Sequence, residues 1–264
     1  MMPVNPKEYC HELDLKALDM LRAIPGFSGA LKGFMKIMNE KMLHGVNMAS
    51  KVRLGPQQLP EIYNMLPPIC ERLGIVEPEL YLEMNPMPNA YTFGDTQVFI
   101  TVTSGLLECM EMDEVRAVLA HECGHIACRH VLYHTMGSMI LNGAAEVLNL
   151  GLITVPLKLA FFHWERCSEF SCDRAAALCV GGYESVVETM IRLAGGPKSI
   201  TSRINEELYL QQAAEYEQLI GESKWDKILQ YYALMNSSHP FTAMRASEVK
   251  KWCESAQFRR LMQY

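Results

Sequence analysis

Two histidines stand four residues apart in the stretch Ala117-Val-Leu-Ala-His121-Glu122-Cys-Gly-His125-Ile126. Residues at positions i and i+4 project from one face of a helix, so both imidazoles can reach one metal ion. Zn²⁺ takes neutral imidazole readily and prefers tetrahedral coordination. Glu122 follows the first histidine, where a carboxylate can take a proton from a metal-bound water and pass it to a leaving amine. The stretch therefore predicts a metal-binding helix with a general base beside the metal.

A catalytic zinc needs a third protein ligand, with the fourth position left for water. The candidate is Glu169, in the downstream segment Arg166-Cys-Ser-Glu169-Phe-Ser-Cys-Asp173. Asp173 lies four residues later on the same helix face, where it can accept a hydrogen bond from the far nitrogen of a zinc histidine and fix its tautomer. A glutamate and an aspartate at this spacing are a weak signal alone, and a strong one downstream of the first motif.

Composition narrows the class of protein. The chain has 264 residues, 49% hydrophobic and 20% charged, which suits one large globular domain or one domain with helical extensions. The net charge of −6 offers no basic field for nucleic acid. Nine scattered cysteines, an odd number, argue against a disulfide framework. With no apolar signal-peptide core at the start, we expect a reducing, cytoplasmic compartment.

Helical periodicity dominates the chain. Residues 8–50 predict two helices, so we expect an N-terminal helical extension over 1–55 and a second domain over 56–264. The clearest strand is 97–103, and a shorter strand precedes it across a tight connection. The metal-binding helix follows and should run to about His134. The expected fold class is α+β, mostly α-helical, with a small β-sheet just before the catalytic helix.

Three segments together resemble the M48 family of zinc metallopeptidases, the HtpX-like gluzincins: HECGH, ERCSEFSCDRAA and His239-Pro-Phe-Thr-Ala-Met-Arg245. The resemblance covers roughly residues 60–255. It implies a zincin-like fold and one Zn²⁺ per chain. By the same resemblance, the metal ligands are His121, His125 and Glu169, Glu122 is the general base, and Asp173 is the partner of a ligand histidine.

The resemblance also implies roles for residues farther from the metal. Arg166 stands where the family has an arginine before the ligand glutamate. His239 and Arg245 match the family's C-terminal histidine and arginine, which could stabilise the oxyanion of the intermediate or bind a substrate carbonyl or carboxylate. The alternative for His239 is a loop that starts a helix, with Pro240 near its first position.

The segment Asn89-Ala90-Tyr91 resembles the family's Asn-Ala stretch ahead of the catalytic helix. There an edge strand can pair with an extended peptide through backbone hydrogen bonds, giving affinity with limited side-chain selectivity. The expected partner is therefore a peptide or an unfolded protein, and nucleic acid is not expected. The sequence carries no indication of the oligomeric state.

Other histidines and cysteines lie close to the motif. His130 matches a histidine common at that family position, and we interpret it and His134 as structural. Cys123 follows the catalytic glutamate and Cys167 precedes the ligand glutamate. A thiol within reach of zinc would compete with water and silence the site.

These features predict a soluble, zinc-dependent endopeptidase, with two alternatives open. One is a catalytically silent or self-inhibited zinc-binding scaffold, or chaperone-like protein, of the same fold. The other is a protease that docks on a membrane surface through residues 136–162. That segment is apolar, but Glu146 and Lys158 interrupt it, so it falls short of the ~18 uncharged apolar residues that spanning requires. A pair of buried or half-buried helices is the competing interpretation, and membrane association would qualify the cytoplasmic localisation.

Overall fold

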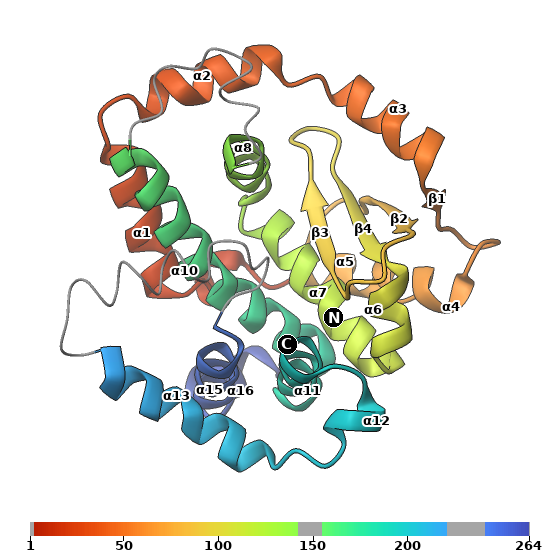
Figure 1. Ribbon diagram of the computed structural model, residues 1–264, viewed down its shortest axis with the longest axis vertical. Coiled ribbons are helices and arrows are strands. Elements are labelled where there is room, and N and C mark those ends of the chain that lie inside the picture. The colour runs from red at the N-terminus through yellow and green to blue at the C-terminus, as the bar shows by residue number, and fades with distance from the viewer. Residues whose placement is uncertain (1–2, 142–154, 221–240, 264) are drawn as a thin grey trace.

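The computed structural model describes residues 3–141, 155–220 and 241–263. Most of these residues are helical, and a small sheet lies to one side of the helices (Figure 1). The expected α+β, mostly α-helical fold class is confirmed.

The elements of the first half are a 3₁₀ turn at Pro6–Glu8, α1 Glu12–Ala23, α2 Phe27–Ile37, α3 Glu40–Ser50, β1 Val52–Arg53, α4 Pro60–Tyr63, α5 Leu66–Leu73, β2 Glu79–Glu83, β3 Ala90–Phe93 and β4 Phe99–Thr103. The elements of the second half are α6 Ser104–Cys109, α7 Met112–Ala127, α8 Val131–Leu141, α10 Val155–Val180, α11 Glu184–Gly195, α12 Lys198–Thr201, α13 Glu206–Ile220, α15 Thr242–Cys253 and α16 Ala256–Leu261.

The sheet has four strands in the order β1-β2-β4-β3. Strand β4 is buried along its whole length, as expected of a run of β-branched and aromatic residues. It pairs parallel with β2 and antiparallel with β3, where Ala90 lies opposite Val102. Strand β3 therefore forms one edge of the sheet, and this edge strand packs beside α7 (Figure 1).

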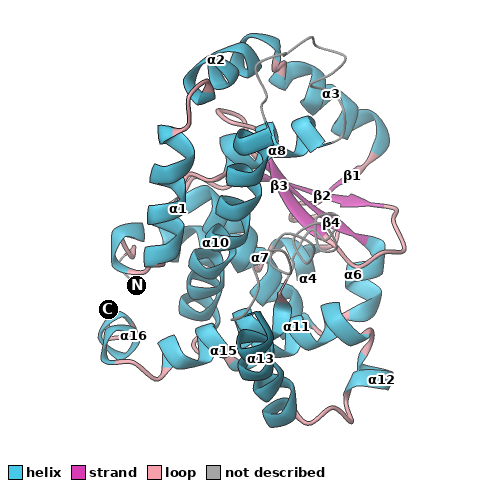
Figure 2. Ribbon diagram, turned by 60° about the vertical axis from the view of Figure 1, so that its left-hand side comes forward, coloured by secondary structure: helices cyan, strands magenta, loops and turns pink. Residues whose placement is uncertain are grey.

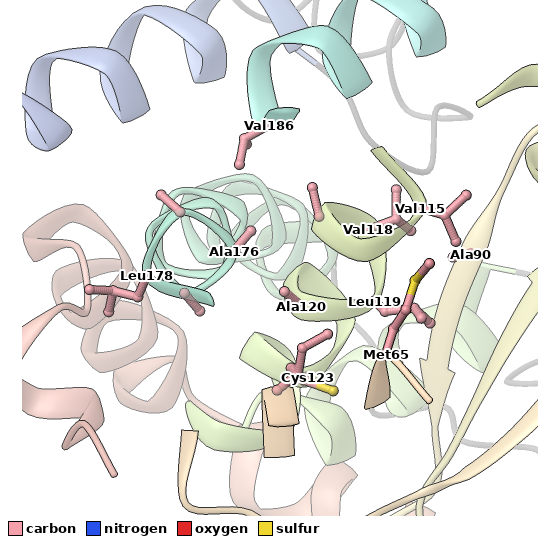
Figure 3. Packing of buried hydrophobic residues seen from close by; sticks show 14 of the residues in the cluster. Met65, Ala90, Val115, Val118, Leu119, Ala120, Cys123, Ala176, Leu178 and Val186 are labelled. Atoms are coloured by element: carbon pink, nitrogen blue, oxygen red, sulfur yellow. The ribbon is translucent and has the colours of Figure 1, made fainter. Parts of the chain in front are cut away.

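Helix α7 is the buried centre of the molecule. A reciprocal capping box starts it: the Glu111 side chain accepts from the backbone of Glu114, and the Glu114 side chain accepts from the Glu111 N–H at 2.8 Å. Arg192 of α11 also pairs with Glu114 at 3.0 Å. Apolar side chains cover α7 on several sides, facing α5, the sheet and α10 (Figure 3). From Ala117 to His125 every residue of α7 is buried, and a helix packed on several sides is held rigidly by its neighbours, which suits a helix that carries a reactive site.

Helix α7 ends earlier than the sequence predicts. The expectation of one helix to about His134 is wrong, because α7 stops at Ala127 and α8 begins at Val131. Arg129 takes a left-handed conformation with φ of 61°, which breaks the helical ladder. No glycine or proline marks the break in the sequence, and after it the His130 N–H donates to the His125 carbonyl of α7 at 2.9 Å.

The N-terminal region contains three helices where two were expected. The extra break falls before Asn39, whose side chain caps α3 by accepting from the N–H of Met42. Helix α1 lies alongside α10 (Figure 2). Together with α2, α8 and the start of α10 it forms a second hydrophobic cluster that contains the fully buried Trp164. The division into units 1–55 and 56–264 stays a prediction.

Among the described residues, no helix combines the length and apolar character needed to cross a membrane. The segment 136–162 that the membrane-docking alternative invokes includes residues 142–154, which lie outside the described part of the chain. All nine cysteines are free thiols.

Candidate metal centre

The metal-binding motif meets its partner segment because α7 and α10 pack at very short range. A Cβ atom at Gly124 would lie 2.9 Å from the Cβ of Ala175 and 3.0 Å from the Cα of Cys172. Real Cβ atoms essentially never approach this closely, so only glycine permits the contact. The close approach places Glu169 of α10 opposite the two histidines of α7.

Both histidines of the motif turn their Nε2 atoms toward Glu169. His121 Nε2 lies 3.5 Å from Oε2 of Glu169, and His125 Nε2 lies 3.3 Å from Oε1. All three side chains are buried. Two donor atoms that are each about 2.0–2.1 Å from a tetrahedral zinc stand about 3.4 Å apart. The spacing of the donors therefore fits a zinc ion between them, and it is long for direct hydrogen bonds.

The carboxylate of Asp173 and the guanidinium of Arg245 contact His121 and Glu169. Asp173 Oδ1 lies 3.0 Å from His121 Nδ1. Arg245 donates to both oxygens of Asp173, at 2.8 and 2.6 Å, and its Nη1 lies 2.8 Å from Glu169 Oε2. Burial lowers the pKa of His121, but the charges of Glu169 and Asp173 outweigh it and raise the pKa to about 10. The same carboxylates that favour a proton on His121 would favour a bound metal cation.

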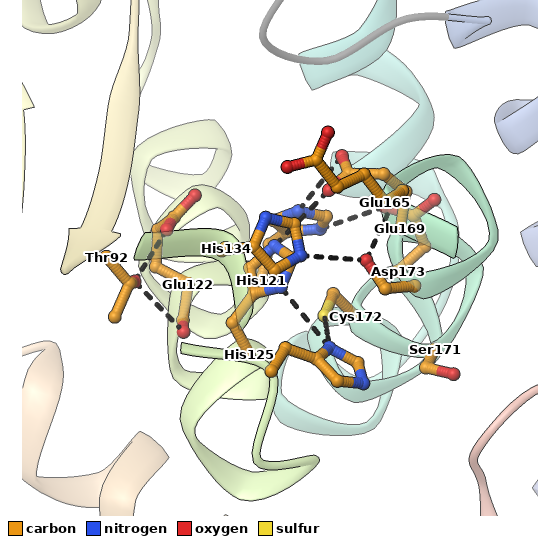
Figure 4. A network of polar contacts seen from close by, with 12 residues as sticks. Thr92, His121, Glu122, His125, His134, Glu165, Glu169, Ser171, Cys172 and Asp173 are labelled. Carbon is orange, nitrogen blue, oxygen red and sulfur yellow. Dashed lines mark hydrogen bonds and ion pairs between the residues drawn. The ribbon is translucent and has the colours of Figure 1, made fainter. Parts of the chain in front are cut away.

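Glu122 occupies the other side of the histidines, next to the sheet (Figure 4). The hydroxyl of Thr92, in strand β3, donates to Glu122 Oε2 at 2.6 Å. Oε1 of Glu122 is buried and has no hydrogen-bond partner among the described residues. Buried polar atoms are rarely left without a hydrogen-bond partner. Glu122 Oε1 can therefore accept a hydrogen bond or a proton from a molecule that enters the site. Sequence reasoning missed Thr92, because nothing in the strand pattern singles it out.

The structure places Arg245 against the carboxylates of α10, and its expected contact with the oxyanion or the substrate stays a prediction. Its guanidinium is buried and is directed at Asp173 and Glu169, so it orients the carboxylates of α10. Arg166 donates from Nε to the Phe162 carbonyl at 3.2 Å, and its guanidinium lies 5.4 Å from the ring centre of Phe241. His239 lies outside the described residues.

The three strand residues proposed to bind substrate are in and next to β3. The Asn89 N–H donates to Thr103 Oγ1 at 2.9 Å, which ties the start of the strand to β4. Tyr91 donates its hydroxyl to Glu83 at 2.6 Å, so its side chain is held within the sheet. Ala90 is buried and lines a cavity together with His121 and Glu122. Strand β3 therefore begins beside His121 and Glu122, and the side chain of Tyr91 is hydrogen-bonded within the protein.

Two further groups of residues could offer donor atoms to a metal. His121, His125 and Cys172 form one group, and His125, His130 and His134 form the other; within each group the donor atoms lie within 4.8 Å of one another. Burial raises the pKa of the Cys172 thiol well above its usual range, which disfavours the thiolate that binds zinc.

The two cysteines that neighbour motif residues in the sequence have their side chains in the hydrophobic clusters. Cys123 is fully buried in the main hydrophobic cluster, and Cys167 belongs to the cluster beneath the N-terminal helices. Neither belongs to a group of described residues with metal-ligand spacing. Among the described residues, the cysteine whose Sγ lies within 4.8 Å of donor atoms of His121 and His125 is Cys172.

A His-Glu-x-x-His helix that faces a glutamate and an aspartate of a second helix defines a metallopeptidase centre. The chain belongs to peptidase family M48, whose model matches residues 56–253. It is thus a metalloprotease, and zinc dependence is general in this family.

Relatives with related functions match the chain over different lengths. It is 32% identical over 262 residues to a plastoglobule-localized chloroplast metallopeptidase 48 of Arabidopsis thaliana, a match that covers 98% of this chain and 76% of the relative. It is 32% identical over 100 residues to a protease HtpX homolog of Sulfurihydrogenibium, covering 37% of this chain and 34% of that protein. Protease HtpX of Legionella pneumophila is 22% identical over 222 residues, covering 72% and 75%. No solved structure matches the chain.

Replacing Gly124 with alanine is expected to push α7 and α10 apart and move the donors away from each other. Overpacking of this kind costs about 1–3 kcal/mol of stability. We expect a lower free energy of unfolding in urea and a reduced zinc content. Gly45→Ala in α3 is the matched control, because a Cβ there meets no atom within 4 Å. A Gly124 variant as stable and as zinc-loaded as the wild type would show that the close contact is not required.

Proposed function

We propose that the chain is a zinc-dependent endopeptidase that holds one Zn²⁺ with His121, His125 and Glu169. The observation that carries the proposal is the spacing of 3.3 and 3.5 Å between the imidazole nitrogens and the carboxylate oxygens. Asp173 supports it, since a carboxylate on Nδ1 of His121 leaves the Nε2 lone pair for the metal. When bound, zinc supplies a Lewis acid that polarises a carbonyl and lowers the pKa of water.

Glu122 is the proposed general base. Its buried Oε1 takes a proton from the attacking water and delivers it to the departing amine nitrogen. The Thr92 hydroxyl holds the other oxygen, so the carboxylate keeps one orientation through both transfers. Arg245 acts by position: it balances the negative charges of Glu169 and Asp173 and keeps both carboxylates in place. His239 keeps, as a proposal, the oxyanion-stabilising role that the family resemblance implies.

The proposed substrate is an extended peptide, or an unfolded protein that supplies one. Strand β3 is an edge of the sheet and carries Thr92, which contacts the general base. A peptide added alongside β3 would lie next to Glu122 and gain backbone hydrogen bonds at little cost in side-chain selectivity. This arrangement supports cleavage of varied sequences in unfolded chains.

Metal removal tests the proposed function. We expect the purified full-length protein to contain one zinc per chain and to cleave casein. A chelator should abolish the cleavage, and added zinc should restore it, because the water is activated only at the metal. The measurements are metal analysis by mass spectrometry and release of labelled casein fragments. Zinc-loaded protein that cleaves neither casein nor unfolded substrates would contradict the proposal and favour a zinc-binding scaffold.

A further inference from the structure

Asp14 is a buried carboxylate in α1, outside the residues that the family model matches. Only 1% of it is exposed. Three donors converge on it: Trp164 Nε1 at 3.1 Å, Ser171 Oγ at 2.5 Å and His130 Nε2 at 3.1 Å. Burial raises the pKa of Asp14, but the hydrogen bonds from His130, Ser171 and Trp164 outweigh it and hold the pKa below its usual value. The carboxylate is therefore an anion with donors on both oxygens.

The break after α7 brings His130 back to the metal-binding helix. The left-handed Arg129 turns the chain, and the His130 N–H then donates to the His125 carbonyl at 2.9 Å. A left-handed conformation in a residue with a side chain costs about 1–2 kcal/mol, and such strain persists where the surrounding structure requires it. The turn places His130 Nδ1 3.4 Å from His125 Nδ1. Two ring nitrogens thus face each other behind the proposed ligand.

The nitrogen that carries the proton in each ring, His125 and His130, is set by the groups at the two ends of this series of contacts, Glu169 and Asp14. His125 points Nε2 at the proposed metal position beside Glu169, and a neutral ring whose Nε2 lone pair binds a metal carries its proton on Nδ1. Asp14 accepts a proton-bearing nitrogen, so His130 carries its proton on Nε2 and presents a lone pair at Nδ1. The Nδ1–H of His125 then meets an acceptor. The opposite tautomer of His130 would set two N–H groups against each other.

Cys172 is the other group at this point, with Sγ 3.6 Å from His130 Nδ1. Its thiol is a weak donor, so it competes poorly with an imidazole N–H for the same lone pair. His134 is engaged separately, through Nε2 at 2.9 Å from Ser168 Oγ.

We propose that Asp14 and His130 are positioning residues of the metal centre, in which Asp14 selects the His130 tautomer that accepts the Nδ1 proton of His125. The proposal rests on the proposed function, since it takes His125 as a ligand. Each ligand histidine then has a carboxylate behind it: Asp173 directly behind His121, and Asp14 behind His125 through one intervening imidazole. The first N-terminal helix is thereby part of the metal centre.

The test is the zinc affinity of Asp14→Asn, measured by competition with a chromophoric chelator on the metal-free full-length protein. An amide can donate to His130 Nε2 and so favour the wrong tautomer. We expect zinc to bind about 10–100-fold more weakly, the usual effect of losing a group that orients a metal ligand. Ser171→Ala is the matched control, because it removes a hydrogen bond between the same two helices and leaves the Asp14–His130 pair. It should lower the melting temperature and leave zinc affinity unchanged.

A double-mutant cycle separates positioning from general packing. With His130→Gln in place, adding Asp14→Asn should cause no further loss of zinc affinity, because the relay is already broken. The cobalt-substituted single variants should share an altered visible spectrum. If Asp14→Asn does not fold, the zinc affinity and cobalt spectrum of His130→Gln decide instead.

Three results would overturn the proposal. The first is wild-type zinc affinity in folded Asp14→Asn, or in His130→Gln if Asp14→Asn does not fold. The second is a loss of zinc affinity in Ser171→Ala as large as in Asp14→Asn, and the third is a double variant in which the two losses of zinc affinity multiply. Failure of the proposed function looks different, since the wild-type protein would then bind no zinc, or would bind zinc and cleave nothing.

Discussion

Glu122→Gln is expected to retain zinc at the wild-type level and to lose peptide hydrolysis, with kcat falling about 10²–10⁴-fold. The amide has nearly the shape of the carboxylate, and its oxygen can still accept from the Thr92 hydroxyl. It cannot accept the proton of the attacking water at the position of Oε1, which is buried without a protein partner in the described residues. The chemistry should therefore fail while the fold and the metal remain.

The measurement is kcat on a fluorogenic peptide, with zinc content determined on the same preparation. Thr92→Val is the graded control, because it keeps the carboxylate and removes the hydroxyl that donates to Glu122 Oε2 at 2.6 Å and to the Glu122 carbonyl at 3.3 Å. Its activity should lie between those of the wild type and Glu122→Gln. Full turnover by zinc-loaded Glu122→Gln, purified alongside a wild type free of contaminating proteases, would rule out Glu122 as the base.

Glu169→Gln is expected to weaken zinc binding by more than about 100-fold, beyond the 10–100-fold effect of losing an orienting partner, and to abolish activity. The substitution replaces the carboxylate that faces both imidazoles with a neutral amide. It also sets an amide against the guanidinium of Arg245, which lies 2.8 Å from Oε2. Zinc would then have only two imidazole ligands from the proposed set.

The matched control is Glu165→Gln, one turn earlier on the same helix. Burial raises the pKa of Glu165 to about 8, so this side chain is mostly protonated at neutral pH and resembles glutamine already. Zinc affinity is the quantity to compare, by chelator competition on both variants. Tight zinc binding by Glu169→Gln, or an equal loss in Glu165→Gln, would remove Glu169 from the ligand set.

The parts of the site that could be predicted from the sequence have local signals. The spacing of His121 and His125 is a helical period, and the run 97–103 has strong strand propensity. Glu169 and Asp173 are also four residues apart on one helix face, a spacing that indicates a metal site only downstream of a first motif that requires a third ligand. The fold class followed from the same periodicities, because most of the chain repeats at helical spacing.

The remaining parts depend on contacts between distant segments. Thr92 meets Glu122 across 30 residues, and Asp14 meets His130 across more than a hundred, with no periodicity to connect them. The break at Arg129 has neither glycine nor proline to announce it. The family resemblance gives Arg245 a role toward the oxyanion or the substrate, but its contacts with Asp173 and Glu169 depend on the packing of α15 against α10, which no local pattern predicts.

The identity of the metal ligands can be measured directly by anomalous diffraction at the zinc edge, on crystals of the zinc-loaded protein. We expect one zinc peak about 2.0–2.2 Å from the Nε2 atoms of His121 and His125 and from a carboxylate oxygen of Glu169. A peak at the Sγ of Cys172, or among the rings of His125, His130 and His134, would contradict the proposed centre.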